Sequence, residues 1–360
     1  MAEIGVAVVG FGLAGRVFHA PFVSAVPGLK LEAIVQRRGD EAAKAYPGAR
    51  ILRSVEDALN DASIRLIVVG TPNETHYDLA KKALLAGKHT VIDKPFAASS
   101  AEARELIRIA AENNLILAPF HNRRWDGDFK TVRKLLDRGE LGRVVTYESH
   151  FDRFVPLPRE SPWKESSHDA NGMLFDLGPH LVDQALTLFG APQSITASVR
   201  RDRDKTDIED AFDITLHYPR LQAICRATML ASEPSPRFLI HGTKGSFIKY
   251  GLDPQEPTLG AGGTVPPVGN PREWLGEPES AWGTLVVAPD LANPAALTRT
   301  KVKTELGDYR DFYANVRDAI LGIAPLAVSS EDGYRVIRLL ELARQSSAQG
   351  KTLQVDFSAA

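Results

Sequence analysis

The sequence predicts an α/β protein in two parts: a doubly wound parallel sheet over residues 1–120 and a strand-rich α+β part over residues 121–360. Three observations predict it. Apolar strand-like runs alternate with helix-like segments as far as residue 120, the order expected of parallel strands joined by helices. Later segments alternate apolar and polar residues with a period of two, which is typical of an antiparallel sheet with one buried face. A chain of 360 residues is long enough for two or three domains.

The composition excludes several classes of protein. With 44% hydrophobic and 24% charged residues, the chain has enough apolar mass to form a core, which excludes extensive disorder. A net charge of −2 gives no general attraction to nucleic acid or to anionic membranes. One cysteine, Cys225, cannot form an internal disulfide or an all-cysteine metal site, and we expect no metal. No apolar run approaches the roughly 18 residues of a membrane span, and the start of the chain lacks signal-peptide features, so we expect a cytoplasmic protein.

The first part alternates strands and helices. Residues 4–9 form a continuous apolar run that ends at Gly10, which suits a strand buried on both faces. Ser54 and Ser99 each have an acidic residue three positions later, as in a capping box at the start of a helix. We expect strands at residues 4–9, 31–36, 66–69, 90–93 and 115–120, and helices at residues 13–26, 54–60, 74–86 and 99–113.

The second part contains longer strands. Residues 212–218 and 221–229 alternate around a short turn, which predicts a hairpin with one buried face; Cys225 falls on the apolar side, so we assign it to the core. Residues 251–300 are rich in Gly, Pro and Ala and predict a long loop. We expect further strands at residues 143–151, 238–241 and 246–250, and helices at residues 128–136, 176–189, 308–323 and 331–346.

A glycine-rich motif directly follows the first strand and opens a helix. Its residues are Gly10, Phe11, Gly12, Leu13, Ala14 and Gly15, which fit G-x-G-x-x-G. Gly10 permits the tight turn, Gly12 lets the backbone approach a pyrophosphate, and Gly15 lets helix and strand pack closely. The helix start offers N–H groups to phosphates. The motif predicts a Rossmann dinucleotide-binding domain; the alternative is a glycine-rich turn without a ligand.

The end of the second strand indicates which cofactor would bind. In NAD-binding domains an acidic residue there holds the ribose 2′-hydroxyl, whereas this sequence has Arg37 and Arg38. A carboxylate would repel a 2′-phosphate, and adjacent guanidinium groups would bind it. This favours NADP(H) over NAD; the alternative is a pair of solvated surface arginines.

Three further motifs carry candidate chemistry. Lys94 lies at the carboxyl end of a predicted parallel strand, where ligands bind in open α/β sheets. Asp176 and His180 share one helix face at a spacing of four, so the carboxylate can orient a histidine that moves a proton. Residues 121–125 follow the last strand of the first part and could line a pocket at the junction. Taken singly, each motif also fits an ordinary surface lysine, a surface pair or a hinge.

Together these motifs resemble the glucose–fructose oxidoreductase / inositol dehydrogenase (Gfo/Idh/MocA) family over the full chain. The resemblance rests on residues 10–15, Thr71-Pro72-Asn73 with His76, Asp93-Lys94-Pro95, residues 121–126, and the helix with Asp176 and His180. Asp93 departs from the glutamate that is usual in the family. Residues 10–21, 121–126 and 246–251 look like the NADP-dependent scyllo-inositol dehydrogenase branch.

The resemblance implies a Rossmann domain followed by an α+β domain with a large, mostly antiparallel sheet. It implies that Lys94, Asp176 and His180 form the catalytic set. Cofactor contacts are then expected from Thr71, Pro72, Asn73 and His76 near the nicotinamide ribose, and from Asn122, Arg124 and Trp163 at the edge between cofactor and substrate.

The activity implied is an NADP(H)-dependent interconversion of a secondary alcohol and a ketone on a small-molecule cyclic polyol or sugar, with scyllo-inositol the first candidate. An aldose dehydrogenase of the same family and a dinucleotide-binding sensor without turnover are the alternatives. The outer face of the second sheet is not wholly polar, since it carries Ile224. Family members associate through such a face, so we expect a homodimer or homotetramer.

Overall fold

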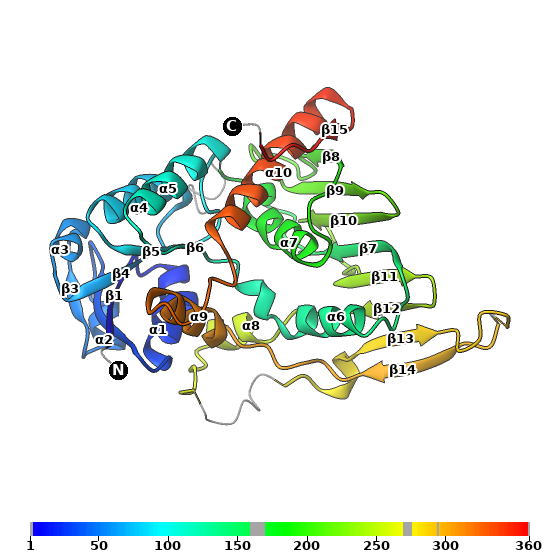
Figure 1. Cartoon of the computed structure of the whole chain (residues 1–360), viewed down its shortest axis with the longest axis horizontal. Coiled ribbons are helices and arrows are strands. Elements are labelled where there is room, and N and C mark those ends of the chain that lie inside the picture. Colours follow the sequence, from blue (N-terminus) through cyan, green and yellow to red (C-terminus); the bar gives the residue numbers. More distant parts are fainter. Residues whose placement is uncertain (1–2, 159–169, 269–275, 294, 359–360) are drawn as a thin grey trace.

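The computed structural model describes residues 3–158, 170–268, 276–293 and 295–358. Two sheets organise the chain, as Figure 1 shows: the first part forms a parallel sheet at one end of the molecule, and the second part forms a larger sheet at the other. The predicted fold class is confirmed.

The first sheet has six parallel strands in the order β3-β2-β1-β4-β5-β6. All residues of the central strand β1 are buried, as a continuous apolar run predicts. The chain order reverses between β1 and β4, which opens a crevice at the carboxyl ends of these two strands. The strands are β1 (Ile4–Val9), β2 (Leu29–Val35), β3 (Arg50–Leu52), β4 (Ile64–Val69), β5 (His89–Ile92) and β6 (Leu117–Pro119).

Helices connect these strands close to the predicted positions. The Ser54 and Ser99 hydroxyls accept hydrogen bonds from the backbone N–H groups of Asp57 and Glu102, both at 3.2 Å, so both predicted N-caps are present. The first helical segment includes a π-helical turn that begins at Gly15. The elements are η1 (Gly15–His19), α1 (Ala20–Ala25), α2 (Glu41–Ala45), α3 (Val55–Leu59), η2 (Asn73–Thr75), α4 (His76–Leu85) and α5 (Ser100–Glu112).

The second sheet has nine strands in the order β14-β13-β12-β11-β7-β10-β9-β8-β15. Every neighbouring pair is antiparallel except β7 and β10. The predicted hairpin is β9 and β10, with Leu221 opposite Tyr218. The strands are β7 (Val144–His150), β8 (Ser194–Arg200), β9 (Ala211–Tyr218), β10 (Leu221–Thr228), β11 (Phe238–Gly242), β12 (Gly245–Lys249), β13 (Gly283–Val287), β14 (Thr298–Val302) and β15 (Leu353–Gln354).

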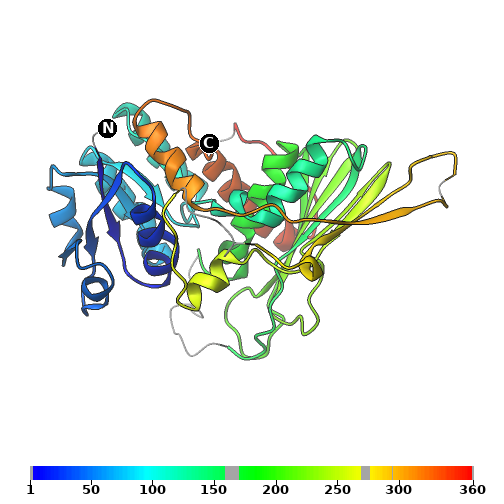
Figure 2. The same cartoon turned by 90° about the horizontal axis from the view of Figure 1, so that it is seen from below.

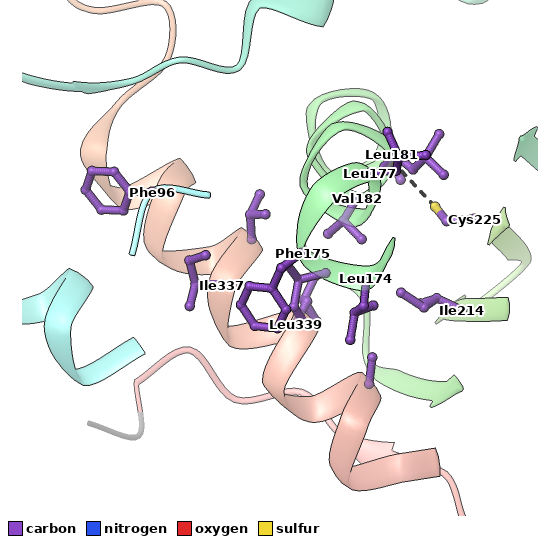
Figure 3. Close-up of a cluster of buried hydrophobic side chains, with 14 of the residues drawn as sticks. Phe96, Leu174, Phe175, Leu177, Leu181, Val182, Ile214, Cys225, Ile337 and Leu339 are labelled. Carbon is purple, nitrogen blue, oxygen red and sulfur yellow. Dashed lines mark hydrogen bonds between the residues drawn. The ribbon is translucent and has the colours of Figure 1, made fainter. Parts of the chain in front are cut away.

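Helices cover one face of this sheet, and the views in Figures 1 and 2 agree that its other face carries no helix in the described part of the chain. The covering helices are α6 (Gly127–Asp137), α7 (Met173–Phe189) and α10 (Ser330–Gln349). Between helices and sheet lies the main core, part of which is drawn in Figure 3. Cys225 is fully buried there and its thiol donates to the Leu181 carbonyl at 3.5 Å, which confirms its place in the core.

The prediction of a long loop over residues 251–300 is wrong. This segment contains α8 (Gln255–Gly260), the short turn η5 (Glu279–Ala281), and the strands β13 and β14. Four of the five residues of strand β14 are exposed, so it shows no period-two burial pattern that a sequence could reveal. It forms through pairing with β13, which itself pairs with β12.

The boundary near residue 120 separates the two sheets but not the two cores. Helix α9 (Arg310–Ile320), far along the chain, packs beside α1 on the first sheet, as Figure 1 shows. Tyr309, Phe312 and Tyr313 share a buried cluster with Val6 and Val8 of β1. The second half of the chain therefore completes one face of the first sheet, a long-range partnership that sequence periodicity does not encode.

Candidate active site

A cleft of about 1570 Å³ lies between the first sheet and the second part of the chain. It is lined by the carboxyl ends of β1, β2, β4 and β5, by helix α7, and by residues near the ends of β7 and β10. Single-ligand pockets commonly have 300–1000 Å³, so this cleft has room for a dinucleotide together with a small substrate.

The glycine-rich loop forms one wall of the cleft. Gly10 has φ +98°, and a Cβ there would lie 2.7 Å from the Gly70 carbonyl oxygen, so a side chain is excluded. A Cβ on Gly15 would lie 2.1 Å from the Gly10 carbonyl oxygen, which explains the close packing of helix and strand. Gly12 has no atom within 4 Å of its Cβ position. Phe11, Leu13 and Ala14 also line the cleft. The open backbone at Gly12 fits the approach of a pyrophosphate.

The two arginines after β2 line the far end of the same cleft. Arg37 and Arg38 are both exposed, and neither has a hydrogen bond or ion pair with another described residue. Arg53 lies beside them: its guanidinium donates to the carbonyl oxygens of Gln36 (3.1 Å) and Gly39 (2.8 Å). Three guanidinium groups therefore lie at this edge, and sequence reasoning missed Arg53 because it lies beyond the next strand.

The loop after β4 lies beside the glycine-rich loop. Thr71, Pro72 and Asn73 line the cleft as expected, and Asn73 donates to the carbonyl oxygen of Ala170 at 2.8 Å, which joins the two parts of the chain. His76 does not reach the cleft wall. Its ring nitrogens lie 2.9 Å and 2.8 Å from the carbonyl oxygens of Pro95 and Thr71, so it holds two cleft-lining loops together instead of facing the cofactor space.

Lys94, Asp176 and His180 come together in the middle of the cleft. The Lys94 ammonium forms an ion pair with the Asp176 carboxylate and donates to the Asp176 main-chain carbonyl at 2.9 Å. Helix α7 begins at Met173, one turn earlier than predicted, so Asp176 and His180 are one helical turn apart on one face. Lys94 follows β5 of the first sheet and Asp176 lies in helix α7, which covers the second sheet, so only the tertiary fold brings them into contact.

His180 is buried and neutral at pH 7. Burial holds its pKa well below the ordinary value, and the nearby cations Arg123 and Lys94 act in the same direction. Its Nδ1 has no hydrogen-bond partner among the described residues. A neutral imidazole beside an ammonium group can accept a proton, which is the requirement for a general base.

Arg153 is a cleft residue that sequence reasoning missed. It follows β7 by three residues, and its guanidinium lies 3.4 Å from the Asp176 carboxylate. Asp176 therefore has a cation on each side, Lys94 and Arg153. Asn171 and Met229 complete this part of the wall. A single arginine after a strand has no recognisable sequence pattern.

The segment after β6 forms the short turn η3 (Asn122–Trp125), which aims successive side chains in different directions. Asn122 is buried at the cleft wall, as predicted. Arg124 points away from the cleft and donates to both oxygens of Asp183 at 2.8 and 2.6 Å. The neighbouring Arg123 lines the cleft instead. Trp163 lies outside the described residues.

In the described parts of the chain, no three His, Cys, Asp or Glu side chains are grouped so that they could hold a metal ion. Within the same ranges, every helix is too short or too polar to cross a bilayer.

Comparisons with known proteins agree with this architecture. Residues 4–121 match the oxidoreductase family with an NAD-binding Rossmann fold, and residues 133–355 match its C-terminal alpha/beta domain. The uncharacterized oxidoreductase YdgJ of Escherichia coli is 40% identical over 98% of both chains. The scyllo-inositol 2-dehydrogenase (NADP(+)) IolW of Bacillus subtilis is 36% identical over 98% of this chain and 96% of its own. The solved structure of the putative oxidoreductase yvaA from Bacillus subtilis superposes with a TM-score of 0.92 at 34% identity, covering 99% of both chains. The chain belongs to the GFO/IDH/MocA oxidoreductase family.

Proposed function

We propose that this oxidoreductase is an NADP(H)-dependent dehydrogenase that interconverts a secondary alcohol and a ketone on a cyclic polyol or sugar, with scyllo-inositol as the first candidate substrate. The observation that carries the proposal is the meeting of Lys94, Asp176 and His180 in the cleft that also holds the glycine-rich loop. A dinucleotide-binding sensor would need the loop but not this proton-transfer set. The similarity to a scyllo-inositol 2-dehydrogenase along nearly the whole chain supports the substrate class.

The chain's own residues would handle the proton and the oxygen. A bound nicotinamide cofactor supplies the hydride acceptor in oxidation and the hydride donor in reduction. In oxidation, the neutral His180 takes the hydroxyl proton as the carbon–hydrogen bond breaks, and in reduction it returns that proton. Lys94 donates a hydrogen bond to the same oxygen and stabilises its developing negative charge. Asp176, held by Lys94 and Arg153, orients the ammonium and the substrate hydroxyls.

The preference for NADP(H) rests on the arginines at the far end of the cleft. Arg37 and Arg38 have no partners among the described residues and face the cleft beyond β2, where a 2′-phosphate would lie. No carboxylate that lines the cleft follows β2 directly: the lining residues there are Gln36, Arg37 and Arg38. Charge-assisted contacts with a 2′-phosphate support the proposal. We also propose a cytoplasmic location, because NADP(H) is available there.

We also propose a homodimer or homotetramer. Ile224 belongs to a row of half-buried side chains on the helix-free face of the second sheet, with Glu148, Leu239 and Ile248 as successive cross-strand neighbours. Three of these four side chains are apolar, a composition that favours association over exposure to water.

The test is absorbance at 340 nm with a panel of inositols, keto-inositols and aldoses, each measured with NADP(H) and with NAD(H). We expect the highest kcat/KM for an inositol with NADP(H). If an aldose gives the highest kcat/KM, the enzyme is an aldose dehydrogenase and the inositol assignment is wrong. Tight NADPH binding without turnover on any member of the panel would identify a sensor and overturn the proposed activity.

A further inference from the structure

A chain of buried polar side chains runs beneath the cleft from helix α9 to Lys94. We propose that Tyr313, His19 and Asp93 position Lys94 for catalysis, an inference that rests on the proposed dehydrogenase function. None of the three belongs to the expected catalytic set. They come from α9, η1 and the end of β5, so the chain connects elements that are distant in the sequence.

The distances define a continuous path. The Tyr313 hydroxyl lies 2.7 Å from His19 Nδ1. His19 Nε2 lies 3.7 Å from Asp93 Oδ2, an electrostatic contact longer than a hydrogen bond, and it has no hydrogen-bond partner among the described residues. The other oxygen of Asp93 accepts the backbone N–H of Lys94 at 2.8 Å. His19 and Tyr313 are fully buried, and the Asp93 side chain is 12% exposed at the cleft.

Packing leaves the His19 ring little freedom. The Phe120 ring meets it edge-on with the ring centroids 4.6 Å apart. On another side, a Cβ on Gly70 would lie 2.9 Å from His19 Cδ2, so only a glycine leaves space for the imidazole there. Gly70 also borders Gly10 of the glycine-rich loop. The histidine is therefore fixed directly beneath the junction of the two cofactor-facing loops.

The protonation states of Tyr313, His19 and Asp93 determine which group donates and which accepts at each contact. Burial, together with the charge of Asp93, raises the pKa of Tyr313 far above neutrality, so its hydroxyl keeps its proton. Donation from this hydroxyl to His19 Nδ1 places the imidazole proton on Nε2, which faces Asp93. Burial acts to raise the pKa of Asp93, but His19 and Lys94 hold it below its ordinary value, so the carboxylate is charged. The opposite tautomer would aim a lone pair at this carboxylate.

These contacts affect the position of the Lys94 side chain. Asp93 holds the first backbone N–H after β5, which sets the direction in which the Lys94 side chain leaves the sheet and reaches Asp176 across the cleft. His19 lies on the far side of the same carboxylate, 3.7 Å from its other oxygen. A misplacement of about 1 Å at such a group can lower turnover a hundredfold.

The experiment compares Asp93→Asn and Tyr313→Phe with the wild-type enzyme. We expect kcat to fall about tenfold or more in Asp93→Asn and about three- to tenfold in Tyr313→Phe, the range that one hydrogen bond gives. KM for NADPH should stay within about twofold. Because both changes act through one chain, the double variant should be no slower than Asp93→Asn alone. Asp93→Glu, which keeps the negative charge, should retain much of the activity that Asp93→Asn loses.

A matched control is Tyr334→Phe, which removes the hydroxyl of another buried tyrosine. This hydroxyl lies outside the cleft and donates to the Phe357 carbonyl at 3.2 Å. The substitution should change the unfolding midpoint but not kcat. Wild-type kcat in Asp93→Asn or Tyr313→Phe, multiplicative losses in the double variant, or losses that match the control's would overturn the positioning role while leaving the dehydrogenase intact. A wild-type protein without turnover on the whole panel overturns the proposed function and the positioning role with it.

Discussion

His180 shows how burial sets the chemistry of a single residue. The side chain lies in a wall that also contains the cations Lys94 and Arg123, so the protonated form is doubly disfavoured. The same surroundings that keep the imidazole unprotonated at neutral pH also lower its affinity for a proton as the pH falls.

Lys94 and His180 should be needed for turnover more than for folding. We expect Lys94→Ala and His180→Ala each to lower kcat by about 10²–10⁴, the usual scale for electrostatic and acid–base groups. NADPH binding, measured by fluorescence titration, should survive in His180→Ala. Near wild-type turnover in either variant would remove the proposed mechanism.

Stability should depend on pH through His180. An unfolded histidine takes up a proton near pH 6.5, whereas folded His180 stays neutral to lower pH because its pKa is lowered. The unfolded state then binds more protons, so the free energy of unfolding falls as the pH drops below about 6.5. Urea unfolding at pH 7 and pH 5 should show a smaller loss in His180→Gln than in the wild type. The exposed His241, replaced in the same way, is the control and should leave the loss unchanged.

The paired arginines should decide the cofactor. A charge-assisted contact is worth roughly 1.5–3 kcal/mol, or about ten- to hundredfold in affinity. Replacing Arg37 and Arg38 together by Ala should raise KM for NADPH by that factor and leave NADH use and saturated kcat nearly unchanged. Arg108→Ala, on the exposed face of α5, is the control. A wild-type enzyme that uses NADH equally well, or a double variant that keeps its preference, would make these arginines ordinary surface residues.

At the scale of elements, helix ends carry information that a sequence reveals. Helix α10 begins with a reciprocal capping box, in which Ser329 accepts from the Asp332 N–H at 3.1 Å and the Asp332 carboxylate accepts from the Ser329 N–H at 3.0 Å. The helix packs against α7 and α5. The helix therefore joins a helix of the first part of the chain to a helix of the second.

Loss of this cap should destabilise the fold without touching the site. Ser329→Ala should lower the free energy of unfolding by about 0.5–2 kcal/mol, with kcat unchanged. Ser358→Ala, at an exposed hydroxyl that bonds only to nearby Asp356 among the described residues, should change it by less than about 0.5 kcal/mol. Chemical denaturation measures both, and equal effects would contradict a capping role.

At the scale of the whole molecule, one sheet face has no covering layer in the described part of the chain. We expect sedimentation at micromolar concentration to show a dimer or tetramer. Ile224→Asp, on this face, should shift the protein toward monomer, because it places a second carboxylate beside Glu148 in an apolar row. Leu85→Asp, at an exposed leucine at the end of α4, should leave the assembly intact. A wild-type monomer would contradict the proposal.

Local sequence patterns were sufficient to predict much of the fold and part of the candidate site. The alternation of apolar runs predicted the parallel sheet, the glycine spacing predicted the loop at Gly10–Gly15, and the i, i+4 spacing placed Asp176 and His180 on one helix face. These features are readable because each depends on residues close in the chain, whose period or spacing reflects the geometry of one element.

Tertiary structure alone decided the rest. It placed α9 on the first sheet, brought Arg153 to Asp176, formed β14 by pairing with β13, and directed Arg124 to Asp183 instead of the cleft. It also connected Tyr313 to Lys94 through His19 and Asp93. Periodicity indicates that one face of a helix or strand is buried, but it does not indicate which other element covers that face. The choice of partner depends on packing and charge between segments that can be hundreds of residues apart, and a single sequence does not display those contacts.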